Sequence, residues 1–416
     1  MKLYKRKIFD KIQPYFGDDT ILVLLGARQV GKTHLLHYID NYLQQQSHKT
    51  LYYDLEYPDL LNLLNQGVDA FIVDLGSKGY VKDEPIFVFI DEIQYLENPS
   101  SFLKIIADHH KNIHLIVSGS STFDIKAKFT DSLVGRTLNF EIFPLSFSEF
   151  LTFKESPYTN ITNLSTAGLA HIKMLYREYI TYGGYPKIVL EANAIKKKQH
   201  LLQIIDTYVR KDIRDLGDVI DISKFNSMLK VLSAQSGQLL NVSSLARETS
   251  ISEPTLHKYL SLLEETFILK RITPYSHSPS VEISKNPKVF FLDSGLQSLL
   301  WLGDFQSTLL GNIFETNVYS ELVKAYGRES IHFWRTKSGQ EIDFIIEQGS
   351  SLTPIEVKTN FGQYHSRTLS QFSTRYHSLP GMIVAIDGEP VGDHTLYPWE
   401  LNAIFDYNLL VTNFGK

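Results

Sequence analysis

The feature that most constrains the fold of this chain is an eight-residue run, GARQVGKT, at residues 26–33. It follows five consecutive apolar residues, ILVLL at 21–25, and precedes a segment whose apolar positions 35, 36, 39 and 43 share one helical face. A short run of mostly branched apolar residues that ends at a glycine is typical of a buried parallel strand. The order of strand, glycine-rich turn and helix therefore predicts an α/β fold that begins with a phosphate-binding loop.

The residue types of this loop indicate its chemistry. Glycines at 26 and 31 allow the backbone to turn so that its N–H groups surround phosphate oxygens, and the following helix N-terminus adds positive potential. Lys32 is expected to reach the β- and γ-phosphates of ATP, and the Thr33 hydroxyl is expected to ligate Mg²⁺. The residues predicted to line the bound nucleotide here are Gly26, Ala27, Arg28, Gln29, Val30, Gly31, Lys32, Thr33 and His34.

A second apolar run, PIFVFIDEIQ at 85–94, delivers two carboxylates at the end of a predicted strand. Asp91 is expected to hold Mg²⁺ through water, and Glu92 is expected to orient and deprotonate the attacking water. A protein that only binds nucleotide has no need of Glu92. The sequence therefore favours hydrolysis, with Lys32 and Glu92 as catalytic residues.

Two further candidates lie downstream. The run IHLIVSGSS at 113–121 ends in a polar tip, where Ser120 or Ser121 either contacts the γ-phosphate or simply forms a turn. Arg136 is either a surface residue or an arginine finger, a catalytic side chain that reaches the nucleotide of a neighbouring subunit. Strands that alternate with helices over this region predict a doubly wound parallel sheet.

These motifs, in this order, resemble the AAA-type P-loop ATPases of bacteria and archaea that carry a DUF4143-like C-terminal domain. The resemblance covers nearly the whole chain. It implies an AAA+ ATPase core that uses ATP and Mg²⁺ and forms a homo-oligomer, with a hexamer as one form. It rests on GARQVGKT, FIDEIQ, SGSS, GR…FPLSFSEF, GGYP (183–186), YVRKDI (208–213) and FWRTKSGQEIDFII…PIEVK.

The chain is long enough for several domains. Within residues 226–283, three amphipathic helical segments precede FILKRITPY, and a second strand-like run follows at 288–293, which is the winged-helix pattern. The third helix would expose Thr255, His257, Lys258 and Ser261, either to a DNA major groove or to a protein partner. The predicted domains are an ATPase at 1–155, a helical connector at 156–225, a winged helix at 226–283 and a nuclease-like domain at 284–416.

The last of these domains carries a second acidic pattern. Its predicted order of helix, three strands, helix and strand is typical of the restriction-endonuclease-like fold, and its acidic spacing is similar to that of Holliday-junction resolvases. Two carboxylates and a Glu-x-Lys pair converge on Mg²⁺ in that fold, and the metal activates water. The candidate residues are Asp343 and Glu356 as metal ligands, with Glu315 and Lys358 beside them. An alternating strand also places residues 356 and 358 on one face as a plain solvated pair, and the same fold serves for docking without catalysis.

Composition restricts the partners and the location. The net charge is −5, so any contact with DNA must come from local basic patches, of which the candidates are 2–7, 126–128, 196–198 and 210–214. No apolar run reaches the ~18 residues of a membrane helix, no long apolar segment follows the basic start, and there are no cysteines. We therefore expect a cytoplasmic protein without membrane contact.

Three functions remain open at this point. The first is an ATPase that acts on DNA, for example in branch migration or strand separation. The second is an ATP-gated, metal-dependent DNA endonuclease in defence or recombination. The third is an ATP-controlled protein-docking switch without DNA activity.

Overall fold

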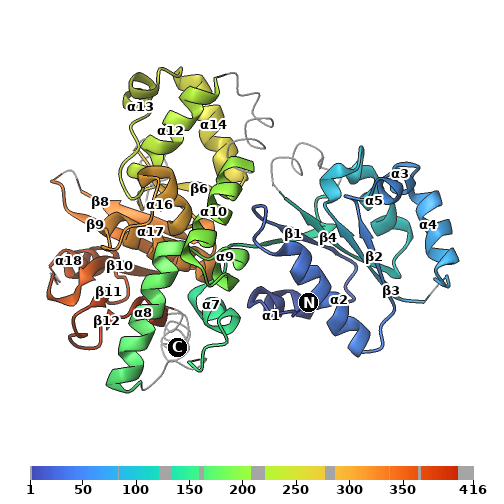
Figure 1. Ribbon diagram of the computed structural model, residues 1–416, viewed down its shortest axis with the longest axis horizontal. Coiled ribbons are helices and arrows are strands. Elements are labelled where there is room, and N and C mark those ends of the chain that lie inside the picture. Colours follow the sequence, from blue (N-terminus) through green and yellow to red (C-terminus); the bar gives the residue numbers. More distant parts are fainter. Residues whose placement is uncertain are drawn as a thin grey trace. The chain divides into compact units, whose positions relative to one another are not determined.

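The computed structural model describes residues 2–82, 84–120, 133–158, 164–207, 221–276, 286–336, 338–363 and 367–401 (Figure 1). The chain divides into two compact units, Met1–Phe143 with Glu265–Phe267, and Pro144–Glu264 with Ile268–Lys416. The predicted boundaries after residues 155, 225 and 283 all fall inside the second unit. The finer division into four domains stays a prediction.

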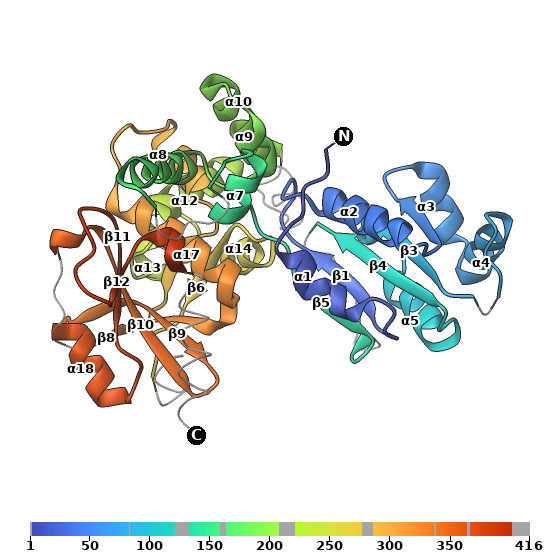
Figure 2. The ribbon, with the colours of Figure 1, turned by 90° about the horizontal axis from the view of Figure 1, so that it is seen from below.

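A five-stranded parallel sheet forms the centre of the first unit, with the strand order β2-β3-β4-β1-β5. Helices lie on both of its faces, for example α2 on one and α5 on the other (Figure 2). The strands β1 and β3 are buried along their whole length, which explains their uninterrupted apolar sequences. The predicted α/β architecture with a parallel sheet is confirmed. The strands are β1 (Ile21–Leu25), β2 (Thr50–Asp54), β3 (Ile86–Asp91), β4 (Ile113–Gly119) and β5 (Thr137–Glu141).

The helices of this unit follow the apolar periodicity of the sequence. The helix α2 buries Leu35, Leu36, Ile39 and Leu43, the four positions that the sequence pattern singles out. The helices are α1 (Ile8–Ile12), α2 (Lys32–Gln45), α3 (Pro58–Asn65), α4 (Val68–Ser77) and α5 (Pro99–His109), with short 3-10 turns at Gln13–Tyr15 and Ile93–Tyr95.

The second unit is centred on two helices that are buried on nearly every side, α16 (Ser294–Leu302) and α17 (Gly311–Tyr326). The helix α16 packs against both α8 (Thr166–Tyr182) and α12 (Ile222–Ala234), so elements of three predicted domains share one core. The remaining helices are α7 (Phe147–Phe153), α9 (Pro186–Leu190), α10 (Ala194–Ile204), α13 (Val242–Thr249), α14 (Glu253–Glu265) and α18 (Arg367–Tyr376), with 3-10 turns at Arg328–Ser330, Phe361–Gln363 and Pro398–Glu400.

The region predicted to be a winged helix contains the expected order of elements. The helices α12, α13 and α14 are followed by an antiparallel pair, β6 (Leu269–Ile272) and β7 (Lys288–Phe291). His257, Lys258 and Ser261 are exposed on α14, whereas Thr255 is half-buried. The identification of these elements as a winged helix stays a prediction.

The C-terminal sheet has the order β12-β11-β10-β9-β8. The strands β8, β9 and β10 are antiparallel neighbours. The strand β11 pairs in parallel with β10, and β12 pairs in parallel with β11. The predicted order of helix, three strands, helix and strand is present, while the restriction-endonuclease-like fold itself stays a prediction. The strands are β8 (Ile331–Arg335), β9 (Glu341–Gln348), β10 (Ser351–Asn360), β11 (Met382–Asp387) and β12 (Thr395–Leu396).

The GGYP run at 183–186 forms a tight joint in the second unit. Gly183 has a φ of +78°, and a Cβ there would meet the carboxylate of Asp293. A Cβ on Gly184 would meet the backbone of Leu145, whose N–H donates to the Gly184 carbonyl at 2.7 Å. Only glycine lets the segments around Leu145, Gly183 and Asp293 approach so closely. The close packing explains why the motif contains two glycines.

Candidate functional site

The carboxyl ends of three strands meet at one edge of the first sheet. The parallel register pairs Leu25 with Gly119 and Ile90 with Val117. The loop after β1, the carboxylates at the end of β3 and the serines at the end of β4 therefore come together. Open parallel sheets bind their ligands at this edge, and the candidates that the structure places here are residues 26–34, Asp91, Glu92 and Ser120.

The loop after β1 has the backbone geometry of a phosphate cradle. Gly31 lies in the left-handed region at φ +96°, and so does the non-glycine Gln29 at φ +63°. A Cβ at Gly26 would overlap the carbonyl of Ile142, so that position accepts only glycine. The 14-residue helix α2 begins at Lys32, and its first N–H groups have no acceptor within the helix. These donors and the adjoining loop fit an anionic ligand.

Lys32 is 5% exposed, and its ammonium donates to the carbonyl oxygens of Gly26 and Ala27, both at 3.0 Å. Burial lowers the pKa of Lys32, although the nearby Glu92 and Asp91 oppose this shift. The lysine is thus held by neutral groups of its own loop, which a phosphate can replace as a stronger, charged partner.

Asp91 is buried and accepts hydrogen bonds from two hydroxyls that the sequence patterns did not single out. The Ser118 hydroxyl donates to its Oδ1 atom, and the Tyr52 hydroxyl donates to its Oδ2 atom at 3.1 Å. Burial, followed by the charge of Asp91, raises the pKa of Tyr52. Tyr52 lies on β2, whose mixed and mostly half-buried sequence TLYYD gives a weaker strand signal than β1 or β3.

Glu92 follows Asp91 in a left-handed backbone conformation, with φ +57° and ψ +50°. This conformation is uncommon outside glycine and asparagine, and such residues gather at functional sites. The Gln94 amide donates both to the Glu92 carboxylate and to the Ser120 hydroxyl, the latter at 3.0 Å. The motif FIDEIQ therefore contributes three side chains to the site, of which the sequence predicted two.

One predicted residue, Arg136, lies apart from this edge. Ser121 falls outside the described residues. Arg136 precedes β5, where its carbonyl accepts from Ile21 N–H at the start of β1, and its guanidinium pairs with Asp108 at 2.7 Å. It therefore lies at the amino ends of the strands, whereas the phosphate loop of its own chain lies at their carboxyl ends.

The second acidic pattern also comes together in space. Leu352 pairs with Glu347 and Ile355 with Phe344, so the continued antiparallel register sets Asp343 opposite Glu356. Asp343 accepts a hydrogen bond from the Val357 N–H at 2.8 Å. Burial, then the charge of Asp343, raises the pKa of Glu315 to about 8 and that of Glu356 to about 7. The predicted quartet is thus one electrostatic cluster.

Two lysines already balance this cluster. Lys358 pairs with Glu356 at 2.5 Å. Lys288, which is 3% exposed and comes from β7, lies 2.6 Å from Glu341 and 3.6 Å from Glu315. Burial lowers the pKa of Lys288, but the carboxylates of Glu315, Asp343 and Glu341 outweigh this and raise it.

The arrangement of these carboxylates does not fit a metal ion as it stands. Among the described residues, no three His, Asp or Glu side chains form a group that could hold one. Two carboxylate oxygens, Glu315 Oε1 and Glu356 Oε2, are nevertheless buried without a hydrogen-bond partner. The Mg²⁺ site predicted at Asp343 and Glu356 therefore stays a prediction.

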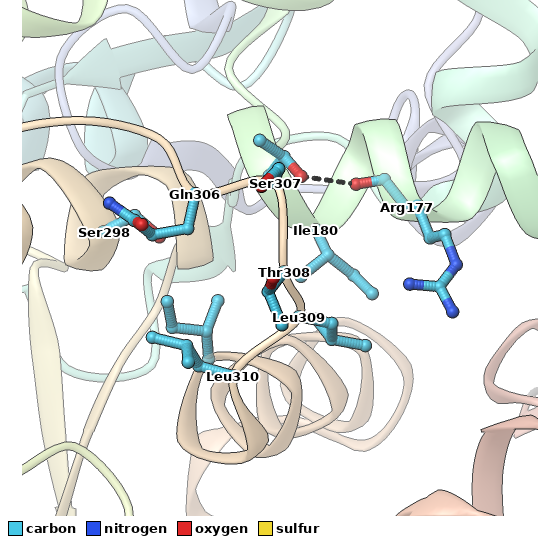
Figure 3. Close-up of a pocket in the computed structure, with 10 residues that line it drawn as sticks. Arg177, Ile180, Ser298, Gln306, Ser307, Thr308, Leu309 and Leu310 are labelled. Carbon is cyan, nitrogen blue, oxygen red and sulfur yellow. Dashed lines mark hydrogen bonds between the residues drawn. The ribbon is translucent and has the colours of Figure 1, made fainter.

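A small pocket in the second unit lies between α8 and the segment that precedes α17 (Figure 3). Its lining includes Arg177, Ser298, Gln306 and Thr308. The Arg177 guanidinium is already paired with both carboxylate oxygens of Asp387, at 2.6 and 2.7 Å. The pocket is therefore a weaker candidate than the edge of the first sheet.

Family models match three parts of the chain. Residues 18–151 match the AAA domain, residues 310–400 match a domain of unknown function (DUF4143), and residues 173–307 match a second domain of unknown function (DUF8612). The AAA match spans every residue of the phosphate loop and both strand-end carboxylates. The first unit is accordingly a P-loop NTPase domain.

Relatives occur in bacteria and archaea. An uncharacterised protein of Haemophilus influenzae is 29% identical over 347 residues, which is 82% of this chain and 82% of the relative. One of Methanocaldococcus jannaschii is 27% identical over 352 residues, covering 83% and 75%. One of Mycobacterium tuberculosis is 23% identical over 356 residues, covering 84% and 72%.

Solved structures give weaker matches. The crystal structure of Cdc6p from Pyrobaculum aerophilum is 12% identical, covers 65% of this chain and 89% of that chain, and has a TM-score of 0.32. The AMPPCP-bound DnaA from Aquifex aeolicus is 15% identical, covers 62% and 86%, and has a TM-score of 0.28. At these scores the similarity supports no conclusion about function. The family models agree with the resemblance read from the motifs: this chain joins an AAA domain to a C-terminal DUF4143 domain, and its relatives occur in bacteria and archaea.

Proposed function

We propose that this chain is a Mg²⁺-dependent ATPase that acts on DNA. The observation that carries the ATPase part is the meeting of Lys32, Asp91 and Glu92 at one edge of a parallel sheet. The left-handed backbone at Glu92 supports it, because that conformation turns the chain sharply just where the predicted base must face the phosphate loop. The described helices include none that is long and apolar enough to cross a membrane.

ATP is the substrate of the proposed reaction. The N–H groups at the start of α2 and the Lys32 ammonium bind its β- and γ-phosphates, and the lysine exchanges its carbonyl partners for phosphate oxygens. Thr33 and Asp91 are the residues that would hold Mg²⁺, which neutralises phosphate charge when it is bound.

Glu92 is the proposed general base. Its carboxylate takes a proton from water while the water oxygen bonds to the γ-phosphorus, and the bond from that phosphorus to the bridging oxygen of ADP breaks. The products are ADP and inorganic phosphate. Gln94 donates to the Glu92 carboxylate and so fixes its orientation, and Ser120 shares the same amide.

The direct test of hydrolysis is phosphate release from Mg²⁺-ATP by the purified chain. We expect Lys32→Ala to lower turnover at least a hundredfold, since it removes the main charge that faces the transferred phosphoryl group. Lys104→Ala is the matched control, because Lys104 is an exposed lysine on α5 of the same unit, and it should leave turnover unchanged. Equal turnover by wild type and Lys32→Ala would reject the ATPase proposal.

The DNA part of the proposal rests on α14. His257, Lys258 and Ser261 are exposed there on the third of three consecutive helices, as expected for a helix that enters a major groove. Binding of forked, four-way-junction and linear DNA at low salt should weaken severalfold in Lys258→Ala. The control Lys224→Ala removes an exposed lysine from α12, the first of these helices, and should bind like wild type. If no DNA binds, a protein-docking switch becomes the better proposal.

Two buried carboxylate oxygens without a hydrogen-bond partner, Glu315 Oε1 and Glu356 Oε2, favour one second candidate, a metal-dependent DNA endonuclease. Incubating the same DNAs with Mg²⁺ or Mn²⁺, with and without ATP, tests it. Cutting that disappears in Asp343→Asn and Lys358→Ala, while ATP turnover persists, would establish the nuclease. Intact DNA under all conditions would leave the ATPase alone.

We also propose that Arg136 acts on the nucleotide of a neighbouring subunit in a homo-oligomer. It lies about 16 Å from the phosphate loop of its own chain, since β1 has five residues at ~3.3 Å each. Mixing two inactive variants tests the proposal. Arg136→Ala keeps an intact base, and Glu92→Gln keeps an intact arginine, so mixed oligomers should regain turnover. No recovery on mixing would contradict action across subunits.

A further inference from the structure

Arg6 differs from the other charged residues of its basic run. The run KLYKRK at 2–7 is one of the patches considered for DNA contact, and Lys5 and Lys7 are exposed as such a patch requires. Arg6 is only 5% exposed and points into the first unit. A buried arginine is expensive unless its donors are satisfied, so its partners indicate what it does.

Two partners of Arg6 are backbone carbonyls that lie far apart in the chain. One terminal nitrogen donates to the carbonyl of Val30 at 2.9 Å, and the other donates to the carbonyl of Phe143, also at 2.9 Å. Val30 lies between the two glycines of the phosphate loop and is fully buried. Phe143 follows β5 and is the residue at which the first unit ends before the second begins.

The same segment after β5 contacts the loop at a second point. The Ile142 N–H donates to the Leu25 carbonyl at 2.6 Å, and the Ile142 carbonyl lies where a Cβ of Gly26 would be. The phosphate loop is therefore held near its start by residue 142 directly and near its middle by residue 143 through Arg6. A planar guanidinium can serve two such acceptors at once in a fixed geometry, which an ammonium on a flexible stem does less well.

We propose that Arg6 is a positioning residue of the nucleotide site, which holds the phosphate loop in the form that binds the phosphates of ATP and ADP. It acts through Val30, and the proposal assigns it no contact with the nucleotide. The inference rests on the proposed nucleotide site and adds to it a residue that no loop or strand motif predicts.

The test uses the full chain with Arg6→Lys and Arg6→Ala, and with Lys7→Ala as the control from the same basic run. The measured quantities are the Kd of fluorescently labelled ATP and ADP, the KM and kcat for ATP, and the midpoint of thermal unfolding. We expect Kd and KM to rise about tenfold in both Arg6 variants, with kcat lowered less than threefold. Lys7→Ala should match wild type.

Each outcome decides the proposal. Wild-type affinity in a folded Arg6→Lys protein would overturn it, because that result would mean that charge alone suffices. Wild-type affinity in both variants, with only the unfolding midpoint lowered, would also overturn it and leave Arg6 a purely structural residue. If Arg6→Ala does not fold, Arg6→Lys decides alone.

The two proposals fail in different ways. A wild-type protein that binds nucleotide but releases no phosphate would reject hydrolysis, while the Kd comparison would still decide the role of Arg6. A wild-type protein that binds no nucleotide would overturn both.

Discussion

The two units each gather acidic side chains at strands of a sheet, but they balance that charge differently. In the first unit, Lys32 donates to carbonyl oxygens of its own loop, which are neutral and replaceable. In the second unit, Lys288 and Lys358 are paired with Glu341 and Glu356 in a largely buried cluster. The first arrangement leaves its cation free to change partners, whereas the second has its counter-charges already in place.

This difference shows what an acidic motif can and cannot indicate. A motif places its carboxylates and its own lysine, Lys32 at the first site and Lys358 at the second, but it does not show a counter-charge that comes from another part of the chain. The lysine of the first site belongs to the motif itself, whereas Lys288 comes from a strand outside the Glu-x-Lys region. A metal ion at the second site would have to compete with an ammonium that is already buried there.

The largest expected effect is on catalysis in the first unit. Glu92→Gln should lower ATP turnover about 10²- to 10⁴-fold, the range for losing a general base, while ATP still binds. Glu97→Gln, at an exposed position shortly after β3, should have no effect. Phosphate release and nucleotide binding measured on the same samples separate the two steps. Retained turnover would remove Glu92 from the mechanism.

The next largest effect is a loss of stability when the charge balance of the second unit is broken. Lys288→Met should destabilise the protein by about 3–5 kcal/mol, because it leaves buried carboxylates without their cation. Lys270→Met is the matched control on the paired strand β6. Its partner Glu329 is mostly exposed, so the loss should be at most about 1 kcal/mol. Urea unfolding measures both. Equal losses would show that the cluster does not depend on Lys288.

A smaller effect concerns the backbone of the phosphate loop. Gly26→Ala should raise the Kd for ATP about tenfold, or ~1.4 kcal/mol, because the new Cβ collides with the Ile142 carbonyl and displaces the loop. Gly76→Ala adds the same atom where nothing lies within 4 Å and should leave the Kd unchanged. Calorimetric titration with ATP compares the two variants. Unchanged affinity in Gly26→Ala would mean that the close approach does not shape the site.

The last expected effect is a gradual pH dependence of stability in the second unit, measured with a chelator present. Between pH 4.5 and about 8 the folded state keeps a proton on Glu315 that the unfolded state releases. Stability should therefore fall as pH rises through this window, by at most ~1.4 kcal/mol per pH unit for one group. Glu315→Gln should make this fall shallower, and the fall that remains should come from other raised carboxyls of the cluster such as Glu356, whose pKa is raised to about 7. A profile that rises with pH would show that ionised carboxylates stabilise the cluster.

The sequence predicted much of the fold because its strongest signals are local. The strands β1, β3 and β4 are predicted by uninterrupted apolar runs, and the helix after GARQVGKT is predicted by its apolar periodicity. Strands that alternate with helices in this order predict a parallel sheet. The strand β2 was not predicted, since TLYYD lacks a run of branched apolar residues and is mostly half-buried. Its Tyr52 is nevertheless a partner of Asp91, and only the pairing of β2 with β3 reveals this.

The candidate sites were predictable to different degrees for the same reason. The motifs themselves contain Lys32, Asp91 and Glu92. The structure connects three more residues to the first unit's site by hydrogen bonds that the sequence does not show, namely Ser118, Gln94 and Arg6. In the second unit the register that sets Asp343 opposite Glu356 follows from the predicted strands. The position of Lys288 could not be predicted from these strands. Its own strand, β7, pairs with β6, and Lys288 reaches the cluster only in the folded unit.

Binding of Mn²⁺ tests the central comparison most directly. Titration of the full chain, with and without a non-hydrolysable ATP analogue, should show about one tightly bound Mn²⁺ that appears only with nucleotide, since the phosphates complete its ligand set. Asp91→Asn should abolish this binding, and Asp343→Asn should leave it unchanged. A tightly bound Mn²⁺ that needs no nucleotide and disappears in Asp343→Asn would contradict the comparison, because it would show that the second cluster takes a metal despite its lysines.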